Sequence, residues 1–296
     1  MKIINVWQWL LVGAFITSCG VSSTSSLKEE WDWRNNPIHF SSEYNYVLET
    51  LPAEGESAKE PWTDSYWPSY KGGLADRWND PAHNDGFEYE LLDQTTVANM
   101  SVEELKKLSP AEKYAIFAGD YGYRLVNSER SRTSPDNERW FGLCHGWAPA
   151  AINFDEPKPI TLTGANGVQI PFGSSDIKAL LTYFQQDPRV RQRTKFLGGR
   201  CNRNLSENPE HSDDAECRDV NAGSFHVIMA NHVGLRGEAF VADVTRDYEV
   251  WNQPIHSFKS EIVDETDTVY ENAAPGTVKI VTVETTMTYT VEINAN

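Results

Sequence analysis

Residues 140–152 read Trp-Phe-Gly-Leu-Cys-His-Gly-Trp-Ala-Pro-Ala-Ala-Ile and organise the chain around one cysteine. The glycines indicate a loop, and the small apolar residues after them indicate a helix. Because proline is tolerated in the first turn of a helix, the pattern predicts a helix that begins near Gly146, contains Pro149 and leaves Cys144 just outside its N-terminus. The helix dipole favours the thiolate form of a cysteine at that position.

The N-terminus predicts export. Lys2 is followed by an apolar run over residues 6–16 and by Ile-Thr-Ser-Cys at residues 16–19, which resembles a bacterial lipobox. The run is too short for a comfortable membrane span, so residues 1–18 are predicted to be a lipoprotein signal peptide and Cys19 the lipidated residue. Gly20 after the cysteine favours the outer membrane, with the domain in the periplasm or at the cell surface. An ordinary signal peptide with a chance cysteine is the alternative.

Export also assigns the remaining cysteines. In an oxidising compartment structural thiols tend to pair, and Cys201 and Cys217 flank a polar loop. Closing a loop of about 15 residues stabilises a fold by roughly 3 kcal/mol, so these two are predicted to form a disulfide. Cys144 then remains unpaired, which makes it a candidate reactive thiol.

Composition limits the class of partner and the number of domains. With 26 Lys and Arg against 43 Asp and Glu, the chain carries a formal net charge of -17, which argues against a nucleic-acid partner. The 296 residues suffice for a sizeable core. Residues 19–60 are acidic and aperiodic and are expected to be a flexible tether or an inhibitory pro-segment, and residues 61–296 the catalytic domain.

Helices are predicted early in the chain and strands late, which indicates an α+β fold. Capping boxes predict two helix starts, at Ser101–Glu104 and Ser109–Glu112, and apolar spacing predicts a third helix over residues 175–186. The predicted strands cover residues 224–233, 238–244 and 278–293, the first two joined by a turn at 234–237 into an antiparallel hairpin.

A cysteine nucleophile needs a base and a group that orients the base. His226 opens the first predicted strand of the hairpin, and Asp243 on the second would lie about one residue pair away, so the predicted triad is Cys144, His226 and Asp243. His145 is a weaker candidate base, because adjacent residues usually point apart. Asp247 is the main rival to Asp243.

This order, with the cysteine at a helix start and the histidine and the acid on an antiparallel sheet, is that of papain-like cysteine enzymes. Residues 250–259, Val-Trp-Asn-Gln-Pro-Ile-His-Ser-Phe-Lys, resemble the peptide elicitor segment of the transglutaminase elicitor family, the secreted transglutaminases of Phytophthora. Departures from that segment fall at residues 255–257. Residues 62–78 and 142–152 also resemble this family, and the similarity spans about residues 61–259.

The resemblance implies a papain-like fold and a protein-glutamine γ-glutamyltransferase, an aminoacyltransferase that forms isopeptide bonds between glutamine and lysine side chains. It implies Cys144 as nucleophile and His226 as base, whereas Asp243 is assigned by spacing. The partners would be a protein or peptide that carries the glutamine and a lysine or other amine acceptor. Trp140, Trp147 and Trp251 are candidate walls that exclude water from the thioester.

Two other functions stay open. A papain-like protease or amidase would use the same three residues and differ only in the fate of the thioester. A lipid-anchored binding protein without catalysis would use residues 250–259 as a surface recognition loop. No cofactor is expected: Asp213 and Asp214 could contribute to a calcium loop, but no EF-hand spacing is present, so no metal site is predicted.

Overall fold

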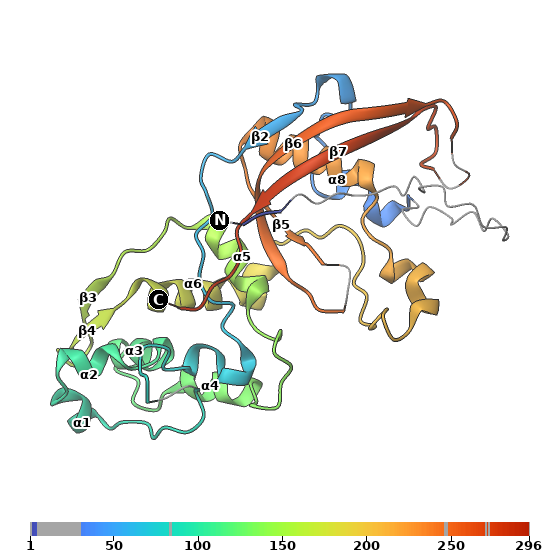
Figure 1. The fold of residues 1–296 in the computed structure, drawn as a ribbon. Coiled ribbons are helices and arrows are strands. Elements are labelled where there is room, and N and C mark those ends of the chain that lie inside the picture. The colour runs from blue at the N-terminus through green and yellow to red at the C-terminus, as the bar shows by residue number, and fades with distance from the viewer. Residues whose placement is uncertain are drawn as a thin grey trace.

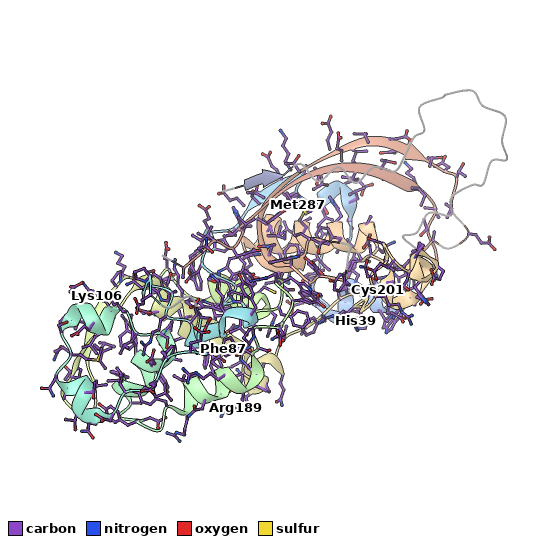
Figure 2. All side chains as sticks on the ribbon, turned by 60° about the horizontal axis from the view of Figure 1, so that its bottom comes forward. His39, Phe87, Lys106, Arg189, Cys201 and Met287 are labelled. Atoms are coloured by element: carbon purple, nitrogen blue, oxygen red, sulfur yellow. A yellow bond between two sulfur atoms is a disulfide. The ribbon has the colours of Figure 1, made fainter. Side chains whose placement is uncertain are left out.

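The structure is a computed structural model that describes residues 2–4, 31–82, 85–245, 248–269, 271 and 273–295. Figure 1 shows an elongated molecule with a helical lobe at one end and a β-sheet lobe at the other. Figure 2 labels Lys106 at one end of the view, in the helical lobe, and Met287 in the sheet lobe, where that lobe begins. The fold is therefore α+β with antiparallel sheets, as predicted. Within the described ranges, no helix combines the length and apolarity that crossing a bilayer requires.

The helical lobe is built from short helices, one small hairpin and single turns of 3-10 helix. Its elements are η4 (Ser69–Lys71), η5 (Gly73–Ala75), α1 (Gln94–Ala98), α2 (Val102–Lys106), α3 (Pro110–Phe117), α4 (Arg124–Arg132), β3 (Ile160–Thr163), β4 (Gln169–Phe172), α6 (Ser174–Gln186) and α7 (Pro188–Arg191). β3 and β4 pair antiparallel.

Local signals explain where these helices begin. Both predicted capping boxes are present: Ser101 and Glu104 open α2, and Ser109 and Glu112 open α3. The helix predicted over residues 175–186 is α6, one residue longer at its start. In each case a side chain accepts hydrogen bonds from backbone N–H groups that have no partner within the first helical turn. The local sequence therefore specifies where the helix begins.

The sheet lobe contains one antiparallel sheet and one helix. Its elements are β1 (Lys2–Ile4), η1 (Trp33–Asn35), η2 (Pro37–His39), η3 (Leu48–Thr50), β2 (Glu54–Glu56), η6 (Pro209–Asp213), η7 (Ala215–Cys217), α8 (Ala222–Met229), the π-helix η8 (Ala230–Arg236), β5 (Phe240–Asp243), β6 (Asn252–Thr266) and β7 (Ile280–Tyr289). The strand order is β1-β7-β6-β2, and β5 also pairs with β6. β7 confirms the late strand, over residues 280–289 of the predicted 278–293.

The two faces of the β5–β6 ladder are covered by different helices. Val241 packs with Trp62 and the alanines of α5 (Cys144–Asn153), whereas Phe240 packs with Ile228 and Met229 of α8. Because successive side chains of a strand point to opposite faces, α5 and α8 lie on opposite sides of β5. α5 also packs against α6, so it lies between the helical lobe and the sheet, as Figure 1 shows.

The hairpin predicted over residues 224–244 is wrong. Residues 222–229 form α8 and residues 230–236 a π-helix, and β5 pairs with β6 instead. Asn221 caps α8 by accepting a hydrogen bond from the backbone N–H of Ser224. The segment is apolar almost throughout, and periodicity alone does not separate a buried helix from a buried strand in such a run. The face that Phe225, Ile228 and Met229 present at helical spacing covers the sheet.

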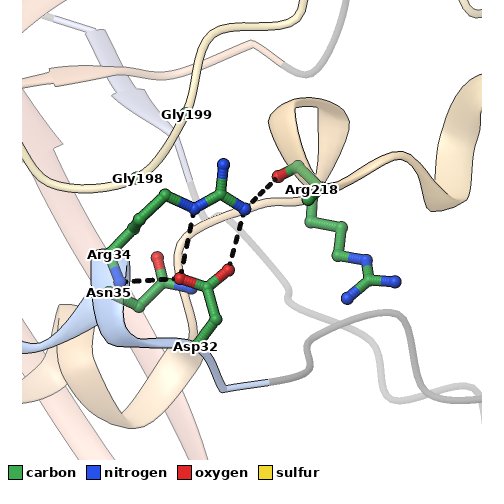
Figure 3. A pocket seen from close by; sticks show the side chains of 7 residues that line it. Asp32, Arg34, Asn35, Gly198, Gly199 and Arg218 are labelled. Atoms are coloured by element: carbon green, nitrogen blue, oxygen red, sulfur yellow. Dashed lines mark hydrogen bonds and ion pairs between the residues drawn. The ribbon is translucent and has the colours of Figure 1, made fainter.

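The flexible tether is wrong for residues 31–60. Tyr44 is buried in the sheet core, and β2 pairs with β6. Near Cys217, the guanidinium of Arg34 donates to the carbonyl of Ala215 at 3.1 Å, and the carbonyl of Arg34 accepts from the N–H of Gly198 at 3.4 Å. Figure 3 shows the same guanidinium paired with Asp32 beside Gly198 and Gly199. The pro-segment alternative stays a prediction, and residues 19–30, with Cys19 and the lipobox, lie outside the described residues.

Candidate active site

Cys144 is the first residue of α5 and is buried. It is a free cysteine, and only 5% of its surface is exposed. The helix begins two residues earlier than predicted, so Pro149 lies inside it and not in its first turn. The N–H of Leu143 donates to the carbonyl of Tyr66 at 2.6 Å, which anchors the loop that leads into the helix. This loop needs a glycine, because a Cβ at Gly142 would lie 2.5 Å from the same carbonyl oxygen.

The sulfur of Cys144 contacts the start of β6. Its thiol donates to the carbonyl of Val250, with Sγ and O 3.4 Å apart. The side-chain amide of Asn252 donates to Sγ, with Nδ2 and Sγ also 3.4 Å apart. More than a hundred residues separate these groups from Cys144 in sequence, so tertiary packing of α5 on β6 creates the site.

Burial controls the protonation of this thiol. Burial raises the pKa of Cys144 above its ordinary value, while hydrogen bonds from the backbone N–H and the side-chain amide of Asn252 lower it and the charge of Glu292 raises it again. The thiolate expected from the helix N-terminus is thus disfavoured in this enclosed state, because the cost of desolvating a charge exceeds the stabilisation by a neutral donor. A substrate or a proton acceptor must lower that cost before the sulfur reacts.

Asp243 lies on the same face of the sheet as the thiol. It is the last residue of β5 and pairs directly with Asn252 across the β5–β6 ladder. By strand alternation it shares a face with Val241, which packs against α5. Its Oδ1 accepts from the N–H of Trp251 at 3.1 Å and from Thr245. The structure therefore brings Asp243, Asn252 and Cys144 to one place.

His226 is placed differently from the prediction. It lies on α8, which covers the other face of β5, so the antiparallel sheet carries Asp243 but not the histidine. Its Nδ1 is buried and has no hydrogen-bond partner among the residues that the structure describes, and burial lowers the pKa of the imidazole. No hydrogen bond joins His226 to the sulfur of Cys144 in the described structure. Its role as base stays a prediction from sequence.

The rival residues are also placed. His145 is exposed on α5 beside the thiol, and Asp247 lies outside the described residues. His232, on η8, lies 3.3 Å through its Nδ1 from a carboxylate oxygen of Glu238, and its ring packs against Tyr44. His232 therefore belongs to the core on the α8 side of the sheet.

The three predicted tryptophans occupy different environments. Trp251 packs edge to face on Tyr66, with ring centroids 5.4 Å apart, next to the residues that contact Cys144. Trp140 packs on Phe141 and Tyr248, and its indole N–H donates to Glu138. Trp147 is fully buried in α5 against Trp62. Trp140 and Trp251 thus lie on the loops that lead to the site, and Trp147 lies in the core beneath it.

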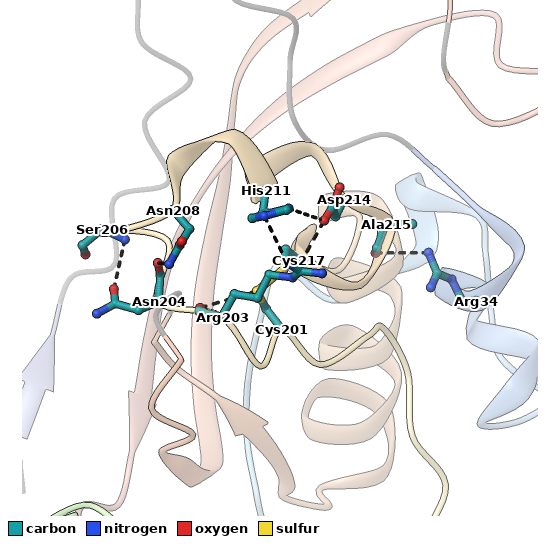
Figure 4. Close-up of a disulfide and its surroundings, with 10 residues drawn as sticks. All are labelled: Arg34, Cys201, Arg203, Asn204, Ser206, Asn208, His211, Asp214, Ala215 and Cys217. Atoms are coloured by element: carbon teal, nitrogen blue, oxygen red, sulfur yellow. Dashed lines mark hydrogen bonds and ion pairs between the residues drawn. A yellow bond between two sulfur atoms is a disulfide. The ribbon is translucent and has the colours of Figure 1, made fainter.

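The disulfide between Cys201 and Cys217 is confirmed (Figure 4). It closes the loop that carries His211, whose Nδ1 lies 2.9 Å from Oδ2 of Asp214. Throughout the described part of the chain, no three His, Cys, Asp or Glu side chains converge as a metal site would require.

Sequence reasoning missed Asn252. The residue stands inside the segment 250–259, which the non-catalytic alternative treated as a surface loop. The segment instead begins β6, and residues 253–256 are buried in the sheet. Residues 252–266 mix polar and apolar side chains and gave no strand signal, and the partner strand β5 had been assigned to the wrong hairpin.

Comparison with known proteins gives two matches. A family model described as "Transglutaminase elicitor" matches residues 32–292. The crystal structure of the GP42 transglutaminase from Phytophthora sojae is similar in fold, with a TM-score of 0.55 and 22% sequence identity over 86% of this chain and 72% of that chain. No curated protein matches the chain.

Proposed function

Because the chain belongs to the transglutaminase elicitor family, we propose that it is a protein-glutamine γ-glutamyltransferase with Cys144 as its nucleophile. Family membership suggests the activity, and the similarity in fold to the Phytophthora sojae enzyme agrees with it. The observation that carries the assignment of the nucleophile is the placement of Cys144. It is the one cysteine outside the disulfide among the described residues, and it begins a helix beside an amide donor and a carboxylate-bearing strand.

The first half of the reaction forms a thioester. The sulfur of Cys144, after losing its proton, attacks the carboxamide carbon of a glutamine side chain, and the electrons of the C=O bond move to oxygen. The intermediate collapses as the nitrogen takes a proton from the general acid and leaves as ammonia. We assign the proton carrier to His226 on the sequence argument alone, since α8 lies on the far face of β5.

The second half transfers the acyl group. A lysine amine attacks the thioester carbon, loses a proton to the base, and the sulfur leaves as thiolate. We propose that Asp243 fixes the β5–β6 connection, for which the hydrogen bond that it accepts from the N–H of Trp251 is direct support; its role in orienting His226 rests on the sequence spacing alone. Transfer instead of hydrolysis requires that water be excluded, and the packed rings of Tyr66 and Trp251 are the proposed barrier.

The proposed partners are a protein or peptide glutamine donor and a lysine or other primary amine. The chain would be anchored through lipid on Cys19 at the bacterial outer membrane, exposed to the periplasm or the cell surface. Neither a metal nor another cofactor enters the proposed steps.

The test is an amine-labelling assay with a glutamine-donor protein and a fluorescent primary amine. Wild type is expected to attach the label and release ammonia, while Cys144→Ala does neither and keeps its fold by circular dichroism. If wild type releases ammonia without attaching the fluorescent amine, the proposed transferase is wrong and a papain-like hydrolase is the better assignment. Unchanged labelling by Cys144→Ala would remove the nucleophile from this proposal. The same assay on His226→Gln decides its role: loss of turnover at normal stability supports the proton carrier, and full turnover removes it.

A further inference from the structure

The geometry points to Asn252 as a catalytic residue whose amide N–H stabilises the negative charge that develops at Cys144. The inference deepens the proposed function and rests on it for the chemistry of the acyl step. The contact itself, Nδ2 of Asn252 to Sγ of Cys144 at 3.4 Å, is independent of the substrate.

The amide is held in place from both sides of its strand. Asn252 opens β6 and pairs with Asp243, whose carboxylate also fixes the preceding N–H, that of Trp251, at 3.1 Å. The next residue, Gln253, is buried and donates to Glu292 at 2.6 Å. Because Asn252 is already held on a paired strand, its side chain loses little conformational freedom when a charge forms beside it. The hydrogen bond therefore stabilises the charge with little cost in conformational entropy.

Two charged states form within reach of this donor. The first is the thiolate of Cys144: hydrogen bonds from the backbone N–H and from the side-chain amide of Asn252 both lower the pKa of the thiol, against the larger effect of burial. The second is the oxyanion, whose oxygen is bonded to the carbon that Sγ attacks. A group beside Sγ is therefore close to both. The backbone N–H of Cys144, in the first turn of α5, is the natural second donor.

A carboxamide does not ionise near neutral pH and cannot serve as a general acid or base, so its role differs from that of His226 or Asp243. Asn252 stabilises charge without accepting or supplying a proton. A purely structural role, in which the amide only holds β6 against α5, predicts a loss of stability without a shift in the titration of the thiol. Measuring that titration separates the two.

The experiment compares wild type with Asn252→Ala and with Asn252→Asp, which keeps the shape but replaces the donor by a charged acceptor. Asn127→Asp is the matched control: its amide donates to the carbonyl of Gly122 in the helical lobe, far from the site in sequence and packing. The rate of Cys144 alkylation by iodoacetamide is followed by mass spectrometry from pH 6 to about 10, which covers the ordinary thiol range. Turnover is measured with the glutamine donor and the fluorescent amine.

We expect the midpoint of alkylation to rise by about one pH unit in Asn252→Ala, the value of one hydrogen bond to a charged group, and further in Asn252→Asp. The kcat of Asn252→Ala should fall by about 100-fold with little change in KM, as on removal of an oxyanion donor. Asn127→Asp should match wild type in both. The pH midpoint of alkylation is compared between variants, and the plateau rate is not, because removal of the Asn252 side chain also increases the exposure of the Cys144 sulfur to the reagent.

An unchanged midpoint in both variants, with kcat within about threefold of wild type, overturns the inference. If Asn252→Ala fails to fold, the isosteric Asn252→Asp gives the same two readings. If wild type shows no transamidation, the proposed function fails, and the alkylation midpoint still decides whether Asn252 stabilises the thiolate.

Discussion

Replacing Gly146 by alanine tests whether the position of α5 controls the site. A Cβ at Gly146 would lie 2.5 Å from the carbonyl oxygen of Thr182 in α6 and 3.4 Å from Cβ of Gln186. Ordinary contact needs about 3.4 Å, so the two helices must separate by roughly 1 Å. Such overpacking costs about 1–3 kcal/mol, whereas replacing a helical glycine by alanine gains about 0.5–1 kcal/mol. The steric cost is larger, so the variant is expected to be less stable.

The same shift acts on catalysis. Cys144 lies two residues before Gly146 in α5, and a movement of about 1 Å carries Sγ away from the amide of Asn252, which now lies 3.4 Å from it. A misplacement of that size reduces turnover by about 100-fold. Urea unfolding and the amine-labelling assay measure the two effects. Gly223→Ala is the control for stability, because that helical glycine meets only the side-chain oxygen of Asn221, at 3.3 Å.

Three outcomes for Gly146→Ala have separate meanings. Loss of both stability and turnover supports the close approach of α5 and α6. Normal turnover with reduced stability would mean that the helices relax without moving Cys144. A variant as stable and as active as wild type would refute the packing argument.

Three further predictions concern buried charges and the disulfide. Asp176→Asn removes the carboxylate partner of Lys113, whose Nζ lies 2.6 Å away in the core. This variant should lower the free energy of unfolding, measured in urea, by about 3–5 kcal/mol. The double variant with Lys113→Met should lose less stability than the two single variants together. Cys201→Ser with Cys217→Ser opens a loop with a sequence separation of 16 and should cost about 3 kcal/mol, while an unchanged urea midpoint would contradict this. Burial raises the pKa of Asp64 to about 7. The folded state therefore keeps a proton on Asp64 that the unfolded state loses near pH 4. As the pH rises from about 4 to 7, the free energy of unfolding should fall by up to roughly 4 kcal/mol. Asp64→Asn should reduce the slope and leave the part due to Asp76, whose pKa burial also raises to about 7; an equal pH dependence in both proteins would show that Asp64 is not a cause.

Much of the site could be predicted because its signals are local. The position of Cys144 at a helix start follows from the glycines and the small residues of 140–152. The pairing of Cys201 with Cys217 follows from a count of four cysteines with distinct surroundings. The placement of His226 on a strand was wrong because it required the strand pairing of residues 224–244, which depends on residues far away in the chain.

By itself, the sequence determined the helix starts at Ser101 and Ser109, the α+β class and the unpaired cysteine at the tip of α5. The helix starts depend on residues within a few positions of one another, where capping operates. The unpaired state of Cys144 follows from the closure of the Cys201–Cys217 loop, and the α+β class from the order of helices and strands along the chain. Only the tertiary structure decided that residues 222–229 form a helix over the sheet and that Asn252 lies beside the sulfur of Cys144. An apolar run is compatible with either a helix or a strand. Which of the two forms depends on the surface that the run packs against, and here that surface is made by β5 and β6, which follow it in the chain.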